Sequence, residues 1–211
     1  MTHHICVTLL LLFAGILLSG CGNDDKRELR FYRVSVTLTP PLASDSAWLT
    51  IVDDDYQALR ELGAVNGING SFEFSGQTDC TQLAYLRLGT DSTRFVLPFA
   101  LSPDTIRIHI KPHSWIITGG TENQRYQRFL NRYRQMGSQR AALWKSYQKL
   151  AADSTLTEQA ERDLARRDSL VADSMRRYLT WRVRQPDLAA RLIKLRLGNQ
   201  LDTFPRTPRN P

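Results

Sequence analysis

The residues that could bind a metal ion are few, and their spacing does not suit a site. Asp53-Asp54-Asp55 is typical of the start of a calcium-binding loop, but Ala58 stands where such a loop needs glycine and Ala64 where it needs a bidentate glutamate. His109 and His113 are four residues apart, a spacing that joins two ligands on a helix but separates them on an extended segment. We therefore predict a turn at the aspartates and no metal site.

Residues for covalent or acid–base catalysis are no better placed. Cys80 has no histidine or basic residue near it in the sequence to lower the pKa of its thiol. Gly119-Gly120 lacks the lysine spacing of a phosphate-binding loop. The 21 acidic residues offer many pairs of carboxylates but single out none for glycoside cleavage. We expect no enzymatic activity and no cofactor, with a hydrolase of unrecognised carboxylates as an alternative.

The N-terminus carries a chemical signal of a different kind. Ile5 to Leu18 is a nearly unbroken apolar run, too short to span a bilayer as a helix but suited to a secretory signal peptide over residues 1–20. It ends in Leu18-Ser19-Gly20-Cys21, which is similar to the lipobox of bacterial lipoproteins, although the segment before it has no Lys or Arg. The resemblance implies that Cys21 is lipidated and becomes the first residue of the mature chain, anchoring it to a membrane.

Residues 21–28 are polar and predict a short tether behind this anchor. Asp24-Asp25 resembles the acidic surface-export signal of some Gram-negative lipoproteins, and a solvated linker is the alternative, because loops favour such residues. We expect the chain to be lipid-anchored in the cell envelope, at the outer membrane, facing either the periplasm or the cell surface.

A third candidate chemistry is modification of hydroxyl groups. Asp followed by Ser or Thr and then a small or apolar residue recurs along the chain, which resembles an O-glycosylation signal of some Gram-negative bacteria. The alternative is turn and cap chemistry, which explains the copies in loops better than those at Asp168 and Asp173 inside a predicted helix. The candidate acceptors are Ser46, Ser92, Thr105, Ser154, Ser169 and Ser174.

The candidate residues in the first half of the chain are expected to lie on or between β-strands. Short segments rich in β-branched and apolar residues, bounded by Gly, Pro, Asp or Asn, predict an antiparallel β-sandwich or partly open barrel over residues 29–120. Pro98 and Pro112 indicate an edge or a strand end, and the segment Gln57 to Asn69 is expected to hold one helical turn. The predicted strands are Leu29–Thr39, Ala47–Val52, Ser71–Ser75, Gln82–Leu88, Arg94–Phe99, Thr105–Lys111 and Trp115–Thr118.

Helices are expected to position the second half. After Gly119-Gly120 the apolar period changes from two to about three and a half, and we expect Thr121 and Gln124 to cap a helix as a capping box. One apolar stripe runs from Tyr126 to Leu150, more often a packing surface than a ligand groove.

A break at Asp153-Ser154-Thr155 and a capping box from Thr155 to Glu158 predict a second helix, antiparallel to the first. A third, shorter helix from Pro186 is expected to end at Gly198-Asn199. The helical region thus covers residues 121–200, and residues 201–211 form a predicted disordered tail.

Charge separates the two halves. Residues 22–120 carry 9 Lys+Arg against 12 Asp+Glu, whereas residues 121–211 carry 19 against 9, a net charge of +10. A basic face could meet nucleic acid, acidic glycans or an anionic membrane, but arginines spread over long helices more often form a solvated face. We expect no nucleic-acid partner.

Four segments taken in order are similar to a known family. They are Gly70–Gly76 (Gly-Ser-Phe-Glu-Phe-Ser-Gly), Arg94–Phe99, Asp104–Ile108 and Ile117–Asn123. Together they resemble the domain of unknown function 4369 family, the N-terminal domain of lipid-anchored periplasmic proteins of the thiol:disulfide interchange type, over about Leu29 to Asn131. In longer relatives a thioredoxin-like domain follows the helices, and the chain ends at Pro211 without one, so no redox chemistry is carried over.

These expectations combine into a functional hypothesis. We expect a non-enzymatic envelope lipoprotein in which a sandwich with a helical arm binds or scaffolds a protein or glycan partner. The alternatives are an accessory factor of periplasmic thiol–disulfide pathways, which would dock to a separate thioredoxin-like protein, and the hydrolase named above.

Overall fold

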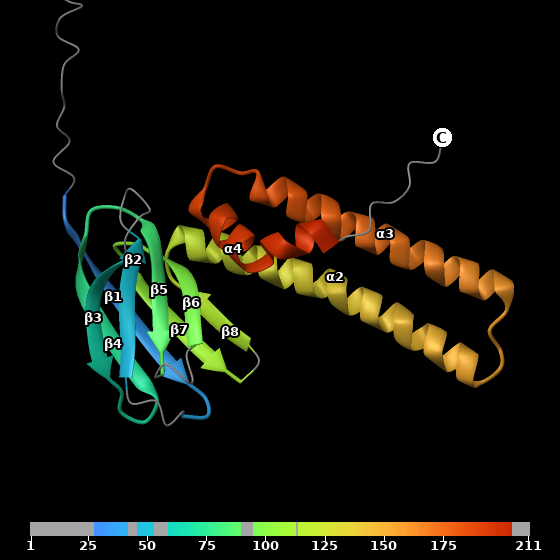
Figure 1. Cartoon of the computed structure of the whole chain (residues 1–211), viewed down its shortest axis with the longest axis horizontal. Coiled ribbons are helices and arrows are strands. Elements are labelled where there is room, and N and C mark those ends of the chain that lie inside the picture. The colour runs from blue at the N-terminus through green and yellow to red at the C-terminus, as the bar shows by residue number, and fades with distance from the viewer. Residues whose placement is uncertain (1–27, 42–45, 53–58, 90–94, 113, 204–211) are drawn as a thin grey trace, which may run out of the picture.

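The computed structural model describes residues 28–41, 46–52, 59–89, 95–112 and 114–203, with the backbone alone for 198–203. Eight strands precede three helices in the described chain (Figure 1). The strands are β1 Arg30–Leu38, β2 Ser46–Val52, β3 Leu59–Asn66, β4 Ser71–Thr78, β5 Gln82–Leu88, β6 Phe95–Leu101, β7 Thr105–Lys111 and β8 Ser114–Thr118. The helices are α2 Thr121–Ala152, α3 Glu158–Val183 and α4 Leu188–Thr203.

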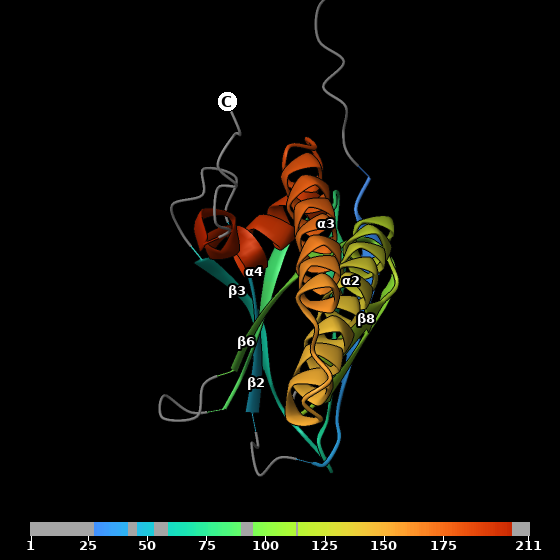
Figure 2. The ribbon, with the colours of Figure 1, turned by 90° about the vertical axis from the view of Figure 1, so that its right-hand side faces the viewer.

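The strands form two four-stranded sheets, in the orders β4-β1-β7-β8 and β3-β2-β5-β6. Strand pairing is antiparallel throughout except between β1 and β7, which run parallel. The sheets lie face to face as an open sandwich (Figures 1 and 2). The predicted fold class, a β-sandwich followed by a helical hairpin and a shorter helix, is therefore confirmed.

Alternating burial builds the core between the sheets. In β1 and β2 every second side chain is buried, because successive residues of a strand point to opposite faces. Pro98 lies in β6, at an edge of its sheet, where a residue without an N–H group removes no interior ladder bond. The alternating buried side chains of β1 and β2 are Tyr32, Val34, Val36, Leu38, Ala47, Leu49 and Ile51.

The helical turn expected between Gln57 and Asn69 is wrong, because Leu59–Asn66 is an edge strand, β3. Its pairing with β2 shifts between Leu49 and Thr50, so that Leu49 faces Gly63 and Thr50 faces Glu61. This bulge breaks the alternation that identifies strands in a sequence. An edge strand with an exposed outer side also tolerates charged residues. The sequence of β3 therefore looks less like that of a strand.

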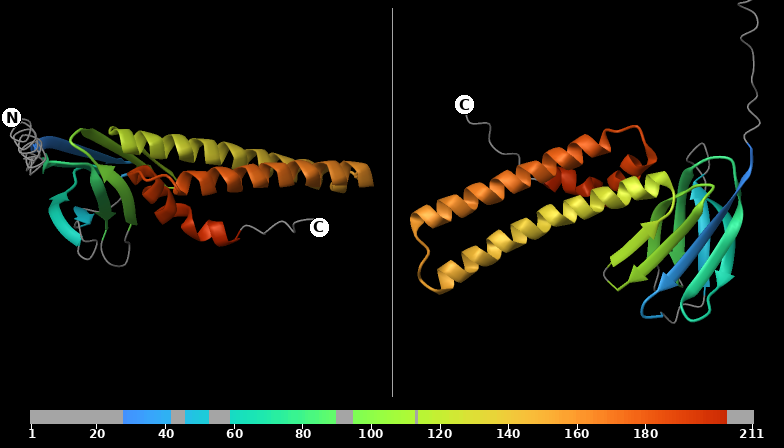
Figure 3. Two further views of the ribbon diagram at one scale, coloured as in Figure 1. Left: turned by 90° about the horizontal axis from the view of Figure 1, so that it is seen from above. Right: turned by 180° about the vertical axis from the view of Figure 1, so that it is seen from behind.

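The helices form an arm that projects beyond the sandwich. Helices α2 and α3 run antiparallel as a hairpin of 32 and 26 residues, and α4 folds back beside the part of the hairpin nearest the sheets (Figure 3). At about 1.5 Å per residue, α2 is roughly 48 Å long, so it extends well beyond the strands next to its start.

Three expected helix ends differ from the structure. The N-cap of α2 is Gly120, which makes no side-chain cap, and not Thr121. The N-cap of α3 is Thr157, two residues after the expected Thr155; the Thr157 hydroxyl accepts from Ala160 N at 3.2 Å. Helix α4 continues through Gly198 to Thr203, because an isolated glycine weakens a helix by only about 1 kcal/mol.

Candidate functional site

The junction between sandwich and arm depends on one buried amide. Asn123, fully buried in the first turn of α2, accepts from Ala100 N at 2.9 Å and donates to Ala100 O at 2.8 Å. Its Nδ2 also donates to Gly119 O at 3.1 Å. A side-chain amide that pairs with both backbone groups of an edge-strand residue extends the sheet by one partner, and so fixes where α2 leaves the sandwich.

Gly119 and Gly120 allow this close approach, and their φ angles of 89° and 71° lie in the region that favours glycine. A Cβ atom at Gly119 would overlap the carbonyl oxygen of Thr105. Gly120 N donates to Asp104 Oδ2 at 2.9 Å, while Asp104 Oδ1 accepts from Thr105 N at 2.7 Å. The turn predicted at these glycines therefore holds the helix against β7.

Helix α4 covers the part of the hairpin that lies next to the sheets. Glu122 accepts from Ala189 N at 2.8 Å, which ties the start of α4 to the start of α2. Arg182, with an 8% exposed side chain, donates to Asp187 Oδ1 at 2.8 Å, and Ala190 N donates to the same oxygen at 2.8 Å. Arg182, Ala190 N and Arg125 lower the pKa of Asp187 in spite of its burial.

The distal half of the hairpin, residues 137–174, has no such cover. Every buried residue of α2 lies at or before Met136, and every buried residue of α3 lies at or after Met175. Beyond these positions the apolar stripe continues but is only half-buried between two helices. Its members are Leu143, Tyr147, Leu150, Leu164 and Val171.

Leu143, Tyr147 and Leu164 of this uncovered stripe line a groove of 590 Å³ between α2 and α3. Trp144, with 60% of its surface exposed, stacks on Tyr147 with ring centroids 5.4 Å apart. We call this surface the distal groove; it is lined by Arg140, Ala141, Leu143, Trp144, Tyr147, Glu161, Leu164, Ala165 and Asp168.

One ion pair closes the distal groove at its end toward the sheets. Arg140 donates Nε to Asp168 Oδ1 at 2.7 Å and Nη2 to Asp168 Oδ2 at 2.8 Å, a bidentate pair across the hairpin. Hydrogen bonds from the guanidinium lower the pKa of Asp168, and the carboxylate in turn raises the pKa of Arg140. Because both charges are satisfied by each other, the groove presents mainly its apolar surface.

A second surface lies at the other end of the arm. Four aromatic rings stack in series from Tyr133 through Phe129 and Tyr178 to Trp181, with centroid separations of 5.6, 5.0 and 6.1 Å. The last ring, Trp181, is 56% exposed and adjoins two shallow hollows of 460 and 370 Å³. Their rims carry arginines: Arg125, Arg128, Arg176, Arg177, Arg182 and Arg184.

The predicted glycosylation sites are scattered over the fold and not brought together. Ser46 begins β2 and its hydroxyl donates to Asn66 Oδ1 at 3.0 Å, while Thr105 is half-buried in β7. Ser154, Ser169 and Ser174 are exposed on the hairpin. Ser92 and the lipidation candidate Cys21 lie outside the described residues.

The two aspartates that turn chemistry explained poorly have other partners. Asp168 pairs with Arg140 across the hairpin, as described above. Asp173 pairs with Arg176 one turn along α3 at 3.2 Å. The Ser174 hydroxyl donates to Leu170 O at 2.8 Å within the same helix. Both aspartates therefore have ion-pair partners in the fold, one across the hairpin and one within α3. Glycosylation of Ser169 and Ser174 stays a prediction.

The candidate residues for metal or thiol chemistry also lie apart. Cys80 is half-buried in the turn between β4 and β5, where its N–H and carbonyl both bond to the Thr78 hydroxyl. His109 lies in β7, whereas His113 and Asp53-Asp54-Asp55 fall outside the described chain. Within the part of the chain that the structure describes, no three His, Cys, Asp or Glu residues are grouped as a metal site.

The sequence did not distinguish the two surfaces on the arm. It shows a single apolar stripe, and the difference between its covered and uncovered halves depends on where α4 packs. Trp144 and Trp181 are both exposed, yet neither differs by sequence spacing from the buried aromatic residues. The one available signal was charge, which changes along the arm as described below.

Comparison with known proteins identifies part of the chain. No described helix is both long enough and apolar enough to cross a membrane. No curated protein matches the chain significantly in sequence. A family model described as "Domain of unknown function (DUF4369)" matches residues 32–126, from β1 into the first turns of α2. The resemblance inferred from the Gly70–Gly76 strand and the segments after it is thereby confirmed, since residues 32–126 of this chain match the DUF4369 family model.

Proposed function

We propose that this chain is a lipid-anchored cell-envelope protein without catalytic activity, whose helical arm binds a protein partner through the distal groove. The sandwich serves as the base and the hairpin carries the binding surface away from it. The buried amide of Asn123 and the turn at Gly119 and Gly120 hold the two parts in a defined relation.

The uncovered apolar stripe is the observation that carries this proposal. A two-helix hairpin buries one face of each helix only in part, and helices depend on tertiary packing for their stability. Near the sheets α4 supplies the third layer, but residues 137–174 contain no buried side chain. An exposed Trp144 over a 590 Å³ groove is the kind of aromatic anchor that dominates protein interfaces.

The chemistry of the distal groove favours a protein over a glycan. Residues 137–174 carry six Lys+Arg and six Asp+Glu, a net charge of zero. The charged pair at the groove, Arg140 and Asp168, is already bonded to itself and offers few free donors or acceptors to sugar hydroxyls. An apolar, uncharged protein surface, such as one face of an amphipathic helix, complements this lining.

The test compares two tryptophans of similar exposure on the same arm. Trp144→Ser removes the aromatic ring from the distal groove, whereas Trp181→Ser removes one from the opposite end. In native membranes, we expect the yield of partner crosslinked at Tyr147 to fall at least tenfold with Trp144→Ser and to be retained with Trp181→Ser. The reason is that loss of an anchor residue costs about 2 kcal/mol. The crosslinked species is identified by mass spectrometry.

Two outcomes would overturn the proposal. Equal loss with both serine variants would mean that the groove is not the binding surface. A crosslink only between two copies of this chain would replace the foreign partner with self-association. The anchor is tested separately by lipid labelling of the protein and of Cys21→Ser, and unchanged membrane partition of this variant would contradict lipid anchoring.

A further inference from the structure

We propose that the basic end of the arm, formed by Arg128, Arg177, Trp181 and Arg184, lies against an anionic phospholipid surface. This surface is distinct from the distal groove. The anchor proposed above is used only to argue orientation, and the experiment below requires neither the anchor nor the protein partner.

The charge of the arm is concentrated at this end. Residues 121–136 and 175–203 together carry eleven Lys+Arg against three Asp+Glu, a net charge of +8, whereas the intervening residues 137–174 are neutral. Uniform charge would suit a solvated face that only keeps the protein soluble. Segregation of this size within the three helices of the arm instead creates a local positive potential.

The arginines around Trp181 are available to a ligand. Arg177 stands four residues before Trp181 on the same face of α3, and Arg184 is the C-cap residue three positions after it. All three side chains line the same hollow. Arg176 pairs with Asp173, and Arg125 with Glu122. Arg128, Arg177 and Arg184 are exposed and form no ion pair with any described residue.

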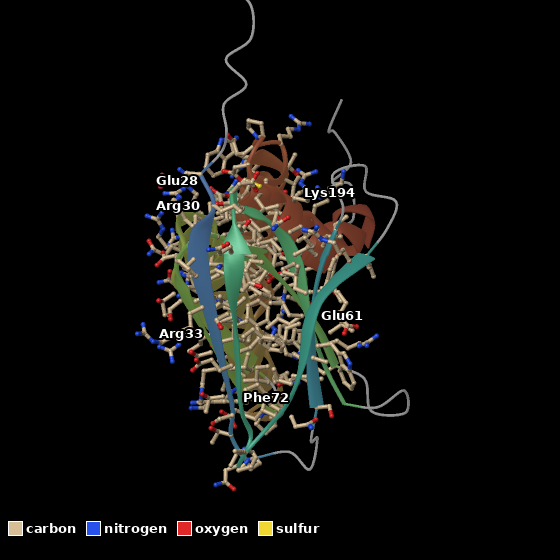
Figure 4. All side chains as sticks on the ribbon, turned by 90° about the vertical axis from the view of Figure 1, so that its left-hand side faces the viewer. Glu28, Arg30, Arg33, Glu61, Phe72 and Lys194 are labelled. Carbon is tan, nitrogen blue, oxygen red and sulfur yellow. The ribbon has the colours of Figure 1, made fainter. Side chains whose placement is uncertain are left out.

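The start of the sandwich lies at the same end of the molecule. Arg33 of β1 pairs with Thr105 of β7, whose carbonyl contacts Gly119 just before α2 begins. In Figures 1 and 2 the start of β1 and the end of α3 nearest the sheets both lie toward the top of the molecule. In Figure 4, Glu28 and Arg30 lie at this upper end with Lys194 of α4, whereas Phe72 lies at the opposite end.

Exposed apolar side chains accompany the charges at this end. Leu29 is 60% exposed and Phe31 is 76% exposed at the point where the chain enters β1, and Trp181 is 56% exposed. Tryptophan and arginine together suit the interface of a bilayer, where a ring with a polar edge inserts among headgroups and guanidinium groups bind phosphates. Nucleic acid and acidic glycans would satisfy the charges, but neither accounts for Leu29 and Phe31 beside the membrane-directed end of the chain.

Vesicle binding of the chain from Gly22 to Pro211 tests this inference. All described strands and helices lie between Arg30 and Thr203, so this chain retains the fold. We expect it to bind vesicles of phosphatidylethanolamine with phosphatidylglycerol, to bind more weakly as salt is raised, and not to bind phosphatidylcholine alone. Trp181→Phe should lose the blue shift of tryptophan fluorescence that the wild-type protein shows on binding, whereas Trp144→Phe should keep it.

A pair of charge-matched variants makes the test specific. Arg177→Gln with Arg184→Gln should weaken binding at least tenfold, since each charge at an anionic surface contributes about 1 kcal/mol, or roughly fivefold. Arg166→Gln with Arg167→Gln changes the net charge equally in the exposed distal hairpin and should leave binding within about twofold, because these residues lie away from the basic end.

Three results would overturn the inference. Equal weakening by both double variants would show that binding follows net charge alone. Binding to phosphatidylcholine of equal strength would remove the role of anionic headgroups. Binding of an acidic polysaccharide such as alginate, dependent on Arg177 and Arg184, with no vesicle binding would assign the surface to a glycan.

Discussion

At the scale of single residues, Asn123 is the side chain on which the placement of the arm depends. Asn123→Ala leaves Ala100 N and O without their side-chain partner in a buried position. Unsatisfied buried polar groups cost about 1–3 kcal/mol each, so we expect the free energy of unfolding to fall by about 3 kcal/mol. Urea denaturation followed by circular dichroism measures the change. Gln124→Ala, at the exposed neighbouring position, is the control and should change it by less than about 0.5 kcal/mol.

The Arg140–Asp168 pair predicts how the stability of the native state changes with pH. The guanidinium lowers the pKa of Asp168 below its ordinary value of 3.8, so the native state favours the ionised carboxylate. The ion pair therefore stabilises the native state fully at pH values above the ordinary pKa of Asp168. This stabilisation is lost as the pH falls through the lower native pKa. Since both side chains are 40% exposed, we expect Asp168→Asn to cost less than about 1 kcal/mol at neutral pH.

Carbon-13 NMR of the Asp168 carboxyl group measures this pKa directly. Arg140→Gln removes the cause of the shift and should return the titration midpoint toward 3.8. The stability difference between wild type and Asp168→Asn should shrink in acid. An Asp168 midpoint that stays in place in Arg140→Gln would show that the ion pair does not hold the hairpin together at this point.

At the scale of elements, sequence patterns predicted the sandwich well because alternation survives wherever a strand faces the core. Tyr32, Val34, Val36 and Leu38 alternate without interruption, and β1 was predicted within one residue at each end. Strand β3 was missed because the bulge opposite Leu49 and Thr50 disrupts its period.

Helix ends were harder to predict, since they depend on tertiary partners. The start of α2 is set by Asp104 and Asn123 across the junction, not by a local capping box. For the same reason the sequence could not locate the distal groove. The apolar stripe is continuous in sequence, and only the packing of α4 against α2 and α3 divides it into covered and uncovered halves.

This division predicts unequal protection along each helix of the hairpin. In hydrogen–deuterium exchange we expect amides of residues 137–152 and 158–174 to exchange faster than those of 121–136 and 175–183, because few buried contacts oppose opening there. A partner bound in the distal groove should slow exchange in the distal segments alone. Uniform protection along α2 in the isolated protein would contradict the two-part description of the arm.

At the scale of the whole molecule, the sandwich, the basic end of the arm and the neutral distal hairpin occupy separate parts of the structure. The proposed functions are thereby separable by mutation. Trp144 and Trp181 differ little in exposure, yet one lies in a neutral apolar groove and the other in an arginine-rich hollow. A substitution at either should affect one surface and spare the other.

A shortened hairpin tests this separation most directly. All the buried hydrophobic side chains of the described chain lie outside residues 137–174, so replacing residues 139–171 with a Gly-Ser turn of about four residues removes no core contact. We expect the shortened protein to fold, with a melting temperature within about 4 °C of wild type, a shift that corresponds to roughly 1 kcal/mol. It should still bind anionic vesicles, because Arg128, Arg177, Trp181 and Arg184 remain, but should no longer capture the partner. Loss of folding would mean that the distal hairpin stabilises the sandwich itself, which its lack of buried side chains argues against.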